Sequence, residues 1–155
     1  MKRYYPNREF PPYSFIPTKN LNPNRVGGYR EGISDPISIP INKDNFLNHK
    51  DYLFAIDLIN HGYYWESHVY FEAIWHAHKR KGDVASYCKA LVKIAAGAIK
   101  NKQGRLESAT RLFEGAVNIL ERLPSTFYLG ITVKDLISIA KMWMDNGQRE
   151  IVLTV

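Results

Sequence analysis

The side chains best suited to chemistry fall within fourteen residues, the stretch GYYWESHVYFEAIW at residues 62–75. Its pattern predicts a helix. At about 100° per residue, His68, Glu72 and His76 follow one another at i, i+4 and i+8 and form one polar ridge. Glu66 lies in the first turn, where a carboxylate suits the exposed N–H groups and the positive end of the helix dipole. Polar side chains crowded among apolar ones indicate either a satisfied polar cluster or a site.

Three aromatic side chains, Tyr64, Trp65 and Trp75, frame these polar groups. Aromatic neighbours exclude water and shift pKa values, which favours acid/base chemistry. Two imidazoles and a carboxylate also suit a divalent metal such as zinc, iron or manganese, with His68, Glu72 and His76 as candidate ligands. These three side chains span about 12 Å of helix axis, so one ion cannot bind all three, and a second helix would have to complete the site.

The next predicted helix supplies two candidate partners, Lys89 and Lys93, which alternate with small apolar residues. If either ammonium group faces Glu66 or Glu72, a partly buried ion pair results. Such a pair would disfavour a metal because it repels cations. The sequence therefore defines a candidate polar cluster of Glu66, His68, Glu72, Lys89 and Lys93 between two helices, and the same lysines are also compatible with a solvated helix face.

Helical periodicity begins at residue 43 and predicts the elements that must position these groups. Breaks at Gly62, Gly82, Gly104 and Pro124 divide the pattern. The predicted helices cover about residues 43–60, 63–79, 84–102, 105–123 and 133–146. We expect an all-α fold, a compact bundle of about five helices built from two antiparallel helical hairpins and a C-terminal helix.

Residues 1–42 contain seven of the eight prolines and cannot form a regular helix. The segment is also rich in aromatic and aliphatic anchors, which argues against a solvated disordered tail. We predict an extended N-terminal arm over residues 1–42, packed on a helical bundle over residues 43–155. The sequence leaves open whether the arm covers its own body or that of a neighbouring subunit in a homo-oligomer. The isoleucines at 37 and 39 could form a short strand that pairs with residues 151–155.

Composition limits the class of protein. The 155 residues carry a net charge of +6, which permits nucleic acid, anionic lipid or a phosphorylated ligand without selecting among them. Cys88 is the single cysteine, so an intrachain disulfide cannot form and a reducing compartment is expected. No apolar run approaches the length of a membrane span, and the first residues lack the apolar core of a signal peptide. We expect a cytoplasmic protein.

The stretch at residues 62–75 resembles the G-x-Y-W-E-A-H-E-x-W-E-x-x-W motif of a bacterial and archaeal family, domain of unknown function number 309. The sequence YCKALVKIAAGAIKNKQGRLESATRLFEGAV resembles the family's second block, and FPPYSFIPTKNLNPNR resembles the opening of some members. The resemblance spans about residues 10–122 and implies an all-helical bundle without an assigned activity. The matching positions are Trp65, Glu66, His68, Glu72 and Trp75.

Departures from the family pattern fall around the same helices. Val69 stands where the family has glutamate, Lys89 and Lys93 replace glutamines, Ala90 replaces glycine, and Arg105 replaces the turn asparagine. A pocket between these helices would therefore be more basic than in the family, which favours an anionic ligand or a pocket filled by its own side chains.

Three hypotheses for function follow from the sequence. The first is a binding or interaction module that uses the polar cluster, with a protein or a small anionic ligand as its partner. The second is a metal-dependent or acid/base hydrolase that uses His68 and Glu72. The third is nucleic-acid binding through the net positive charge. The sequence names no reaction and no ligand.

Overall fold

The computed structural model describes residues 1–146 and 150–155. Within them lie five α-helices, in agreement with the predicted all-α bundle: α1 (Lys50–Asn60), α2 (Tyr64–Ala77), α3 (Asp83–Lys102), α4 (Leu106–Glu121) and α5 (Val133–Asn146). A 3-10 turn, η1 (Phe46–Asn48), precedes α1, and a hairpin of two short strands, β1 (Phe127–Tyr128) and β2 (Ile131–Thr132), precedes α5. No helix in the described part of the chain has the length and apolar character needed to cross a bilayer.

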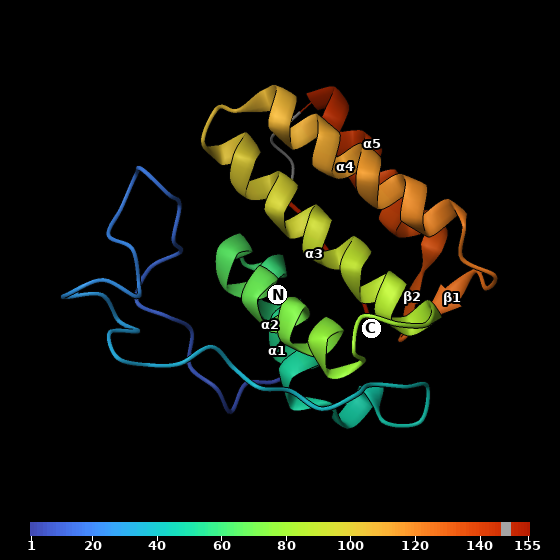
Figure 1. The fold of residues 1–155 in the computed structure, drawn as a ribbon, viewed down its shortest axis with the longest axis horizontal. Helices are drawn as coiled ribbons and strands as arrows, with labels where there is room; N and C mark the ends of the chain where they lie inside the picture. Colours follow the sequence, from blue (N-terminus) through green and yellow to red (C-terminus); the bar gives the residue numbers. More distant parts are fainter. Residues whose placement is uncertain (147–149) are drawn as a thin grey trace.

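Helix α3 lies at the centre of the bundle, between the α1–α2 pair and the α4–α5 pair (Figure 1). Its buried face is rich in alanine and glycine, and this lets neighbouring helices approach closely. At Gly97 a Cβ would lie 2.8 Å from the ring of Phe113 on α4, so the α3–α4 contact requires glycine. The amphipathic pattern of α4 is explained by the buried stripe that faces this contact.

The first helix begins later than predicted, at Lys50 instead of residue 43. The reason is local: His49 is buried, and its Nδ1 accepts the Tyr52 N–H at 3.2 Å as the N-terminal cap. The last helix begins where predicted. Thr132 accepts the Asp135 N–H at 3.0 Å, which caps α5.

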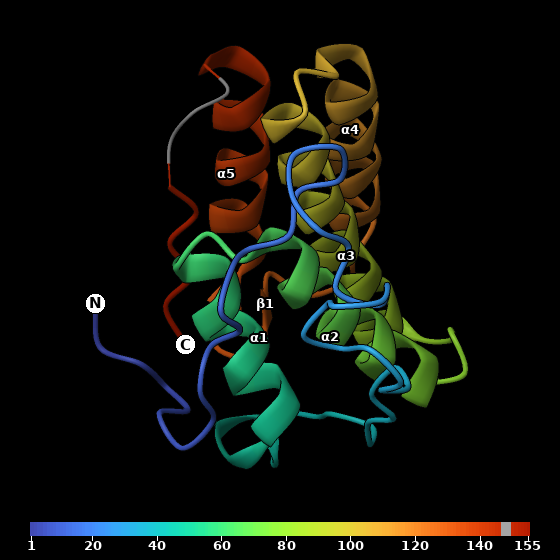
Figure 2. The same cartoon turned by 90° about the vertical axis from the view of Figure 1, so that its left-hand side faces the viewer.

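Residues 1–45 contain no helix or strand, and they run across α1, α2 and the end of α3 (Figure 2). We refer to residues 1–42 as the arm. Side chains of α1 and of the residue that follows α2 bind its backbone. The carboxylate of Asp57 accepts the N–H groups of Tyr4 and Tyr5 at 2.7 and 2.8 Å. At the other end of the arm, His78 Nε2 accepts the Ile41 N–H at 3.0 Å.

The C-terminal residues lie against the same helical pair. Asn60 binds the backbone of Leu153 through both its side-chain atoms, at 2.8 and 2.7 Å. The predicted pairing of residues 37–39 with residues 151–155 is wrong, because neither segment is a strand and Ile37 is 97% exposed. The polar side chain of Asn60 supplies the backbone partners that a strand would have given.

Candidate functional site

Glu66 is the most deeply buried acidic side chain of the motif helix, with 3% of its surface exposed. It lies in the first turn of α2, as the pattern predicted, and its Oε1 accepts two hydrogen bonds from the arm. The donors are the Phe15 N–H at 2.8 Å and the Tyr29 hydroxyl at 2.6 Å. Glu66 therefore binds the arm, and its recorded hydrogen bonds do not involve α3.

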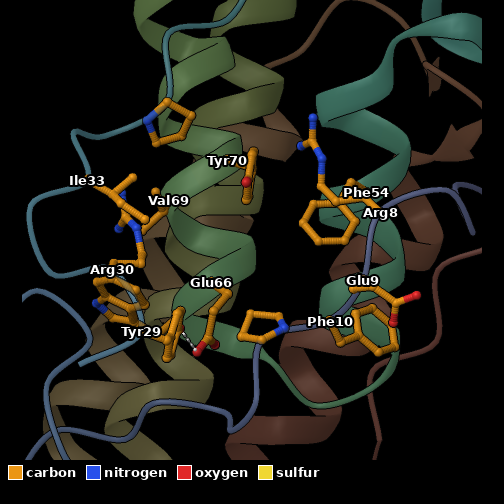
Figure 3. A pocket seen from close by; sticks show the side chains of 13 residues that line it. Arg8, Glu9, Phe10, Tyr29, Arg30, Ile33, Phe54, Glu66, Val69 and Tyr70 are labelled. Atoms are coloured by element: carbon orange, nitrogen blue, oxygen red, sulfur yellow. Dashed lines mark hydrogen bonds between the residues drawn. The ribbon is translucent and has the colours of Figure 1, made fainter. Parts of the chain in front are cut away.

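A cavity of about 270 Å³ lies beside Glu66, between the arm and helices α1 and α2 (Figure 3). Helix α2 contributes neighbouring residues of one face, at positions 65, 66, 69 and 70, and α1 contributes Phe54. Two segments of the arm complete the walls. Together the lining is mainly aromatic and aliphatic, and its charged members are Arg8, Glu9, Arg30 and Glu66. A small concave pocket with a few polar groups is typical of a small-molecule site.

A tight loop in the arm brings Tyr29 and Arg30 to this cavity. The Arg30 N–H donates to the Pro23 carbonyl at 2.9 Å, which closes the loop. Gly28 passes so close to that carbonyl that a Cβ would lie 2.2 Å from its oxygen. A residue with a side chain cannot occupy this position unless the loop opens, so Gly28 fixes the placement of the two residues that follow it.

Burial shifts the titration of both partners of the central hydrogen bond. It raises the pKa of the Glu66 carboxyl, against the opposing effects of the Tyr29 and Phe15 hydrogen bonds and the nearby Arg30 charge. Burial and the bond to Glu66 raise the pKa of Tyr29 well above its usual value. Tyr29 consequently remains a hydroxyl donor, and the raised pKa of Glu66 is a feature that functional carboxyl groups often share.

Both arginines of the cavity have acidic partners and aromatic neighbours. Arg8 pairs with Asp51 at 3.1 Å and lies over the Phe54 ring at 4.9 Å. Arg30 pairs with Asp35 at 2.9 Å and lies over the Trp65 ring at 5.5 Å. These contacts hold planar guanidinium groups along the cavity walls.

The predicted ridge of His68, Glu72 and His76 lies on α2. Glu72 and His76 approach to 4.0 Å, and His76 in turn contacts Arg80 at 3.1 Å. Burial lowers the pKa of His68, although the Glu72 charge opposes this change. In the described ranges 1–146 and 150–155, no three His, Cys, Asp or Glu side chains are grouped closely enough to hold one metal ion.

The lysines of α3 lie apart from Glu66. Lys89 places its Nζ 5.6 Å from the centre of the Trp75 ring. The side chain of Lys93 packs against Gly115 on α4, where an added Cβ would lie 3.3 Å from it. Neither lines the cavity beside Glu66. Glu66 and the two lysines therefore lie in separate environments, and a shared role for the five residues of the predicted polar cluster stays a prediction.

The three residues of the predicted aromatic frame lie in different parts of the structure. Trp65 lines the cavity and packs edge-on against Phe15 at 5.2 Å. Tyr64 is buried in the core and packs against Trp143 at 5.6 Å. Trp75 lies at the other end of α2, with Arg80 at 5.0 Å over its ring.

The sequence prediction missed the arm residues of the site, above all Arg8, Phe10, Tyr29 and Arg30. Their signal was present as aromatic and basic residues interleaved in a proline-rich segment. That composition indicated packing on the body, but no helical periodicity connects the arm to one face of α2.

No curated protein and no solved structure matches this chain. The family match covers the helices from the start of α1 to α4, including Glu66, and it leaves out the arm. Residues 52–112 match the family described as Domain of unknown function (DUF309), which confirms the resemblance of the motif helix and of the helix that follows it.

Proposed function

We propose that this protein is a binding module for a small molecule and that its ligand occupies the cavity between the arm, α1 and α2. The observation that carries the proposal is the cavity itself. Its walls are mainly apolar and aromatic, and Glu66 beside it is buried and held in place by two hydrogen bonds. This combination of an apolar body and a fixed polar group supports recognition of one small ligand.

The preference for an anionic ligand rested on Lys89 and Lys93, and these lysines do not line the cavity. We therefore propose a site between the arm, α1 and α2 in place of one between α2 and α3. We also propose that the arm, residues 1–42, acts as one unit over a bundle of residues 43–155, because it forms a wall of the site. The buried thiol of Cys88 supports a reducing compartment, for which the cytoplasm is our proposal.

Ligand-observed NMR with a set of small aromatic acids, amines and amides tests the binding proposal. Val69 lines the cavity and is half-buried, so Val69→Trp should fill the cavity and abolish binding. Val92→Trp is the matched control, since this half-buried valine of α3 lies outside the cavity. Binding that survives Val69→Trp, or no binding by any member of the set, would overturn the proposal.

A second candidate is acid/base hydrolysis by His68 and Glu72. The favouring observation is that Nδ1 of His68 is buried without a hydrogen-bond partner among the described residues. Its lowered pKa keeps the ring neutral near pH 7, as a general base requires. Under this candidate Glu72→Gln abolishes turnover of a model ester while the unfolding midpoint stays near that of the wild type. Turnover that is unchanged in the variant would exclude it.

A further inference from the structure

Two buried polar atoms beside the cavity lack a hydrogen-bond partner within residues 1–146 and 150–155: Oε2 of Glu66 and Nη1 of Arg30. The first is an acceptor and the second is a donor. Both side chains line the same cavity and come from different segments, α2 and the arm (Figure 3). The cavity thus has an unpaired acceptor and an unpaired donor among its lining residues.

A second polar atom of each side chain already has hydrogen-bond partners. Oε1 of Glu66 accepts from Phe15 and Tyr29, and Nη2 of Arg30 donates to Asp35 at 2.9 Å and to the Ser34 carbonyl at 3.2 Å. These bonds fix the carboxyl and guanidinium groups in place. In each group one polar atom is therefore hydrogen-bonded and the other is not. Buried polar atoms are rarely left without a partner in proteins.

The charge around the cavity favours a neutral ligand. Arg8 and Arg30 are each paired with a carboxylate, from Asp51 and Asp35. A ligand carboxylate could accept from Arg30 but would bring its lone pairs against Glu66. A ligand amidinium could donate to Glu66 but would bring its positive charge against Arg30.

We infer that the ligand is a small, flat, neutral molecule with a carboxamide or lactam edge, whose N–H donates to Glu66 and whose carbonyl accepts from Arg30. This inference rests on the proposed binding function. The aromatic rings of Phe10, Phe54 and Tyr70 provide apolar walls for the flat body of the ligand.

Three probes of nearly equal shape separate the charge classes: benzamide, benzoate and benzamidine. Binding to the full chain is measured by titration calorimetry at one pH and salt concentration. We expect benzamide to bind at least about tenfold more tightly than either of the others, because it alone offers one donor and one neutral acceptor.

The variant Glu66→Gln gives a readout that a purely structural role would not produce. The new side-chain oxygen can keep both hydrogen bonds to the arm, and its NH₂ then replaces Oε2 at the cavity. The glutamine NH₂ and Arg30 then both donate, so the preferred probe should change from benzamide to benzoate, whose two oxygens both accept. The variant Glu114→Gln lies on α4, outside the cavity, and should leave the order of the probes unchanged.

Benzamide preferred by the wild type, with a switch to benzoate in Glu66→Gln, supports the inference. Benzoate or benzamidine preferred by the wild type would overturn the amide class while leaving the binding function intact, provided Val69→Trp abolishes that binding. An unchanged order in Glu66→Gln would overturn the role of Oε2. If no probe and no member of the wider set binds, the inference and the proposed function both fail.

Discussion

Replacing Glu66 by alanine removes the acceptor for two donors of the arm, the Phe15 N–H and the Tyr29 hydroxyl. Each hydrogen bond to a charged group contributes about 1.5–3 kcal/mol, so the gross loss is about 3–6 kcal/mol. Removal of the buried carboxyl offsets part of this loss, because its desolvation cost disappears. We expect a net loss of about 2–4 kcal/mol in the free energy of unfolding, or roughly 5–15 °C in Tm for a chain of this size.

The glutamine variant separates the hydrogen bonds from the charge. A carboxyl whose pKa is raised in the folded state contributes stability that is fully present below its ordinary pKa of 4.5 and is lost as the pH rises through the raised value. Glu66→Gln has no such titration and keeps an acceptor for the arm. The wild type should therefore lose stability relative to Glu66→Gln as the pH rises.

Urea unfolding at a series of pH values between about 4 and 8 measures this difference directly, since one unit of pKa shift corresponds to about 1.4 kcal/mol. Glu114→Gln is the control, because Glu114 is exposed on α4 and its change should stay within about 0.5 kcal/mol at every pH. A wild type that gains stability relative to Glu66→Gln with rising pH would refute the reasoning, since the hydrogen bonds and Arg30 would then outweigh burial.

Three further predictions concern the packing of the arm and the bundle. Asp57→Ala should lower the free energy of unfolding by about 2–4 kcal/mol, because it removes two charged hydrogen bonds to the arm. Hydrogen exchange should become faster at the first residues of the chain, and unchanged protection there would contradict the role of Asp57. Gly97→Ala should lower the free energy of unfolding, measured with urea, by about 1–2 kcal/mol because its Cβ meets the Phe113 ring. The Cβ of Gly115→Ala meets only a flexible lysine, so this variant should be neutral or stabilising. Burial lowers the pKa of His78, so the neutral ring stabilises the fold above its ordinary pKa of 6.5, and this stabilisation is lost as the pH falls. The free energy of unfolding should therefore decrease between about pH 7 and 5 in the wild type, and His78→Leu should not show this decrease.

The helical bundle was predictable because its signals are local. The apolar periodicity of residues 105–123, the glycines that end helices and the Thr132 cap each act within a few residues along the chain, and the observed helices follow them closely. The motif helix was recognisable for the same reason, and the match at residues 52–112 confirms the resemblance over those residues.

The position of Glu66 in the first turn of α2 also followed from the sequence, but its partner did not. Periodicity places a side chain on a face of its own helix and leaves open which distant segment covers that face. The arm has no period, since its proline-rich backbone takes irregular conformations, and its register over α2 depends on contacts such as Asp57 with Tyr4. The lysines of α3 were therefore a reasonable expectation for Glu66, although the structure places the arm there.

The amino-acid sequence by itself determined the elements of this protein: five helices, an extended arm, and a helix in which acidic, imidazole and aromatic side chains are crowded. Only the tertiary structure decided which of these side chains meet. It joined Glu66 to Tyr29 by a hydrogen bond across more than thirty positions of the chain and brought Arg30 to the cavity beside them. The physical reason is that local propensities act over one or two turns, whereas a site forms where desolvation and hydrogen bonding select among distant segments.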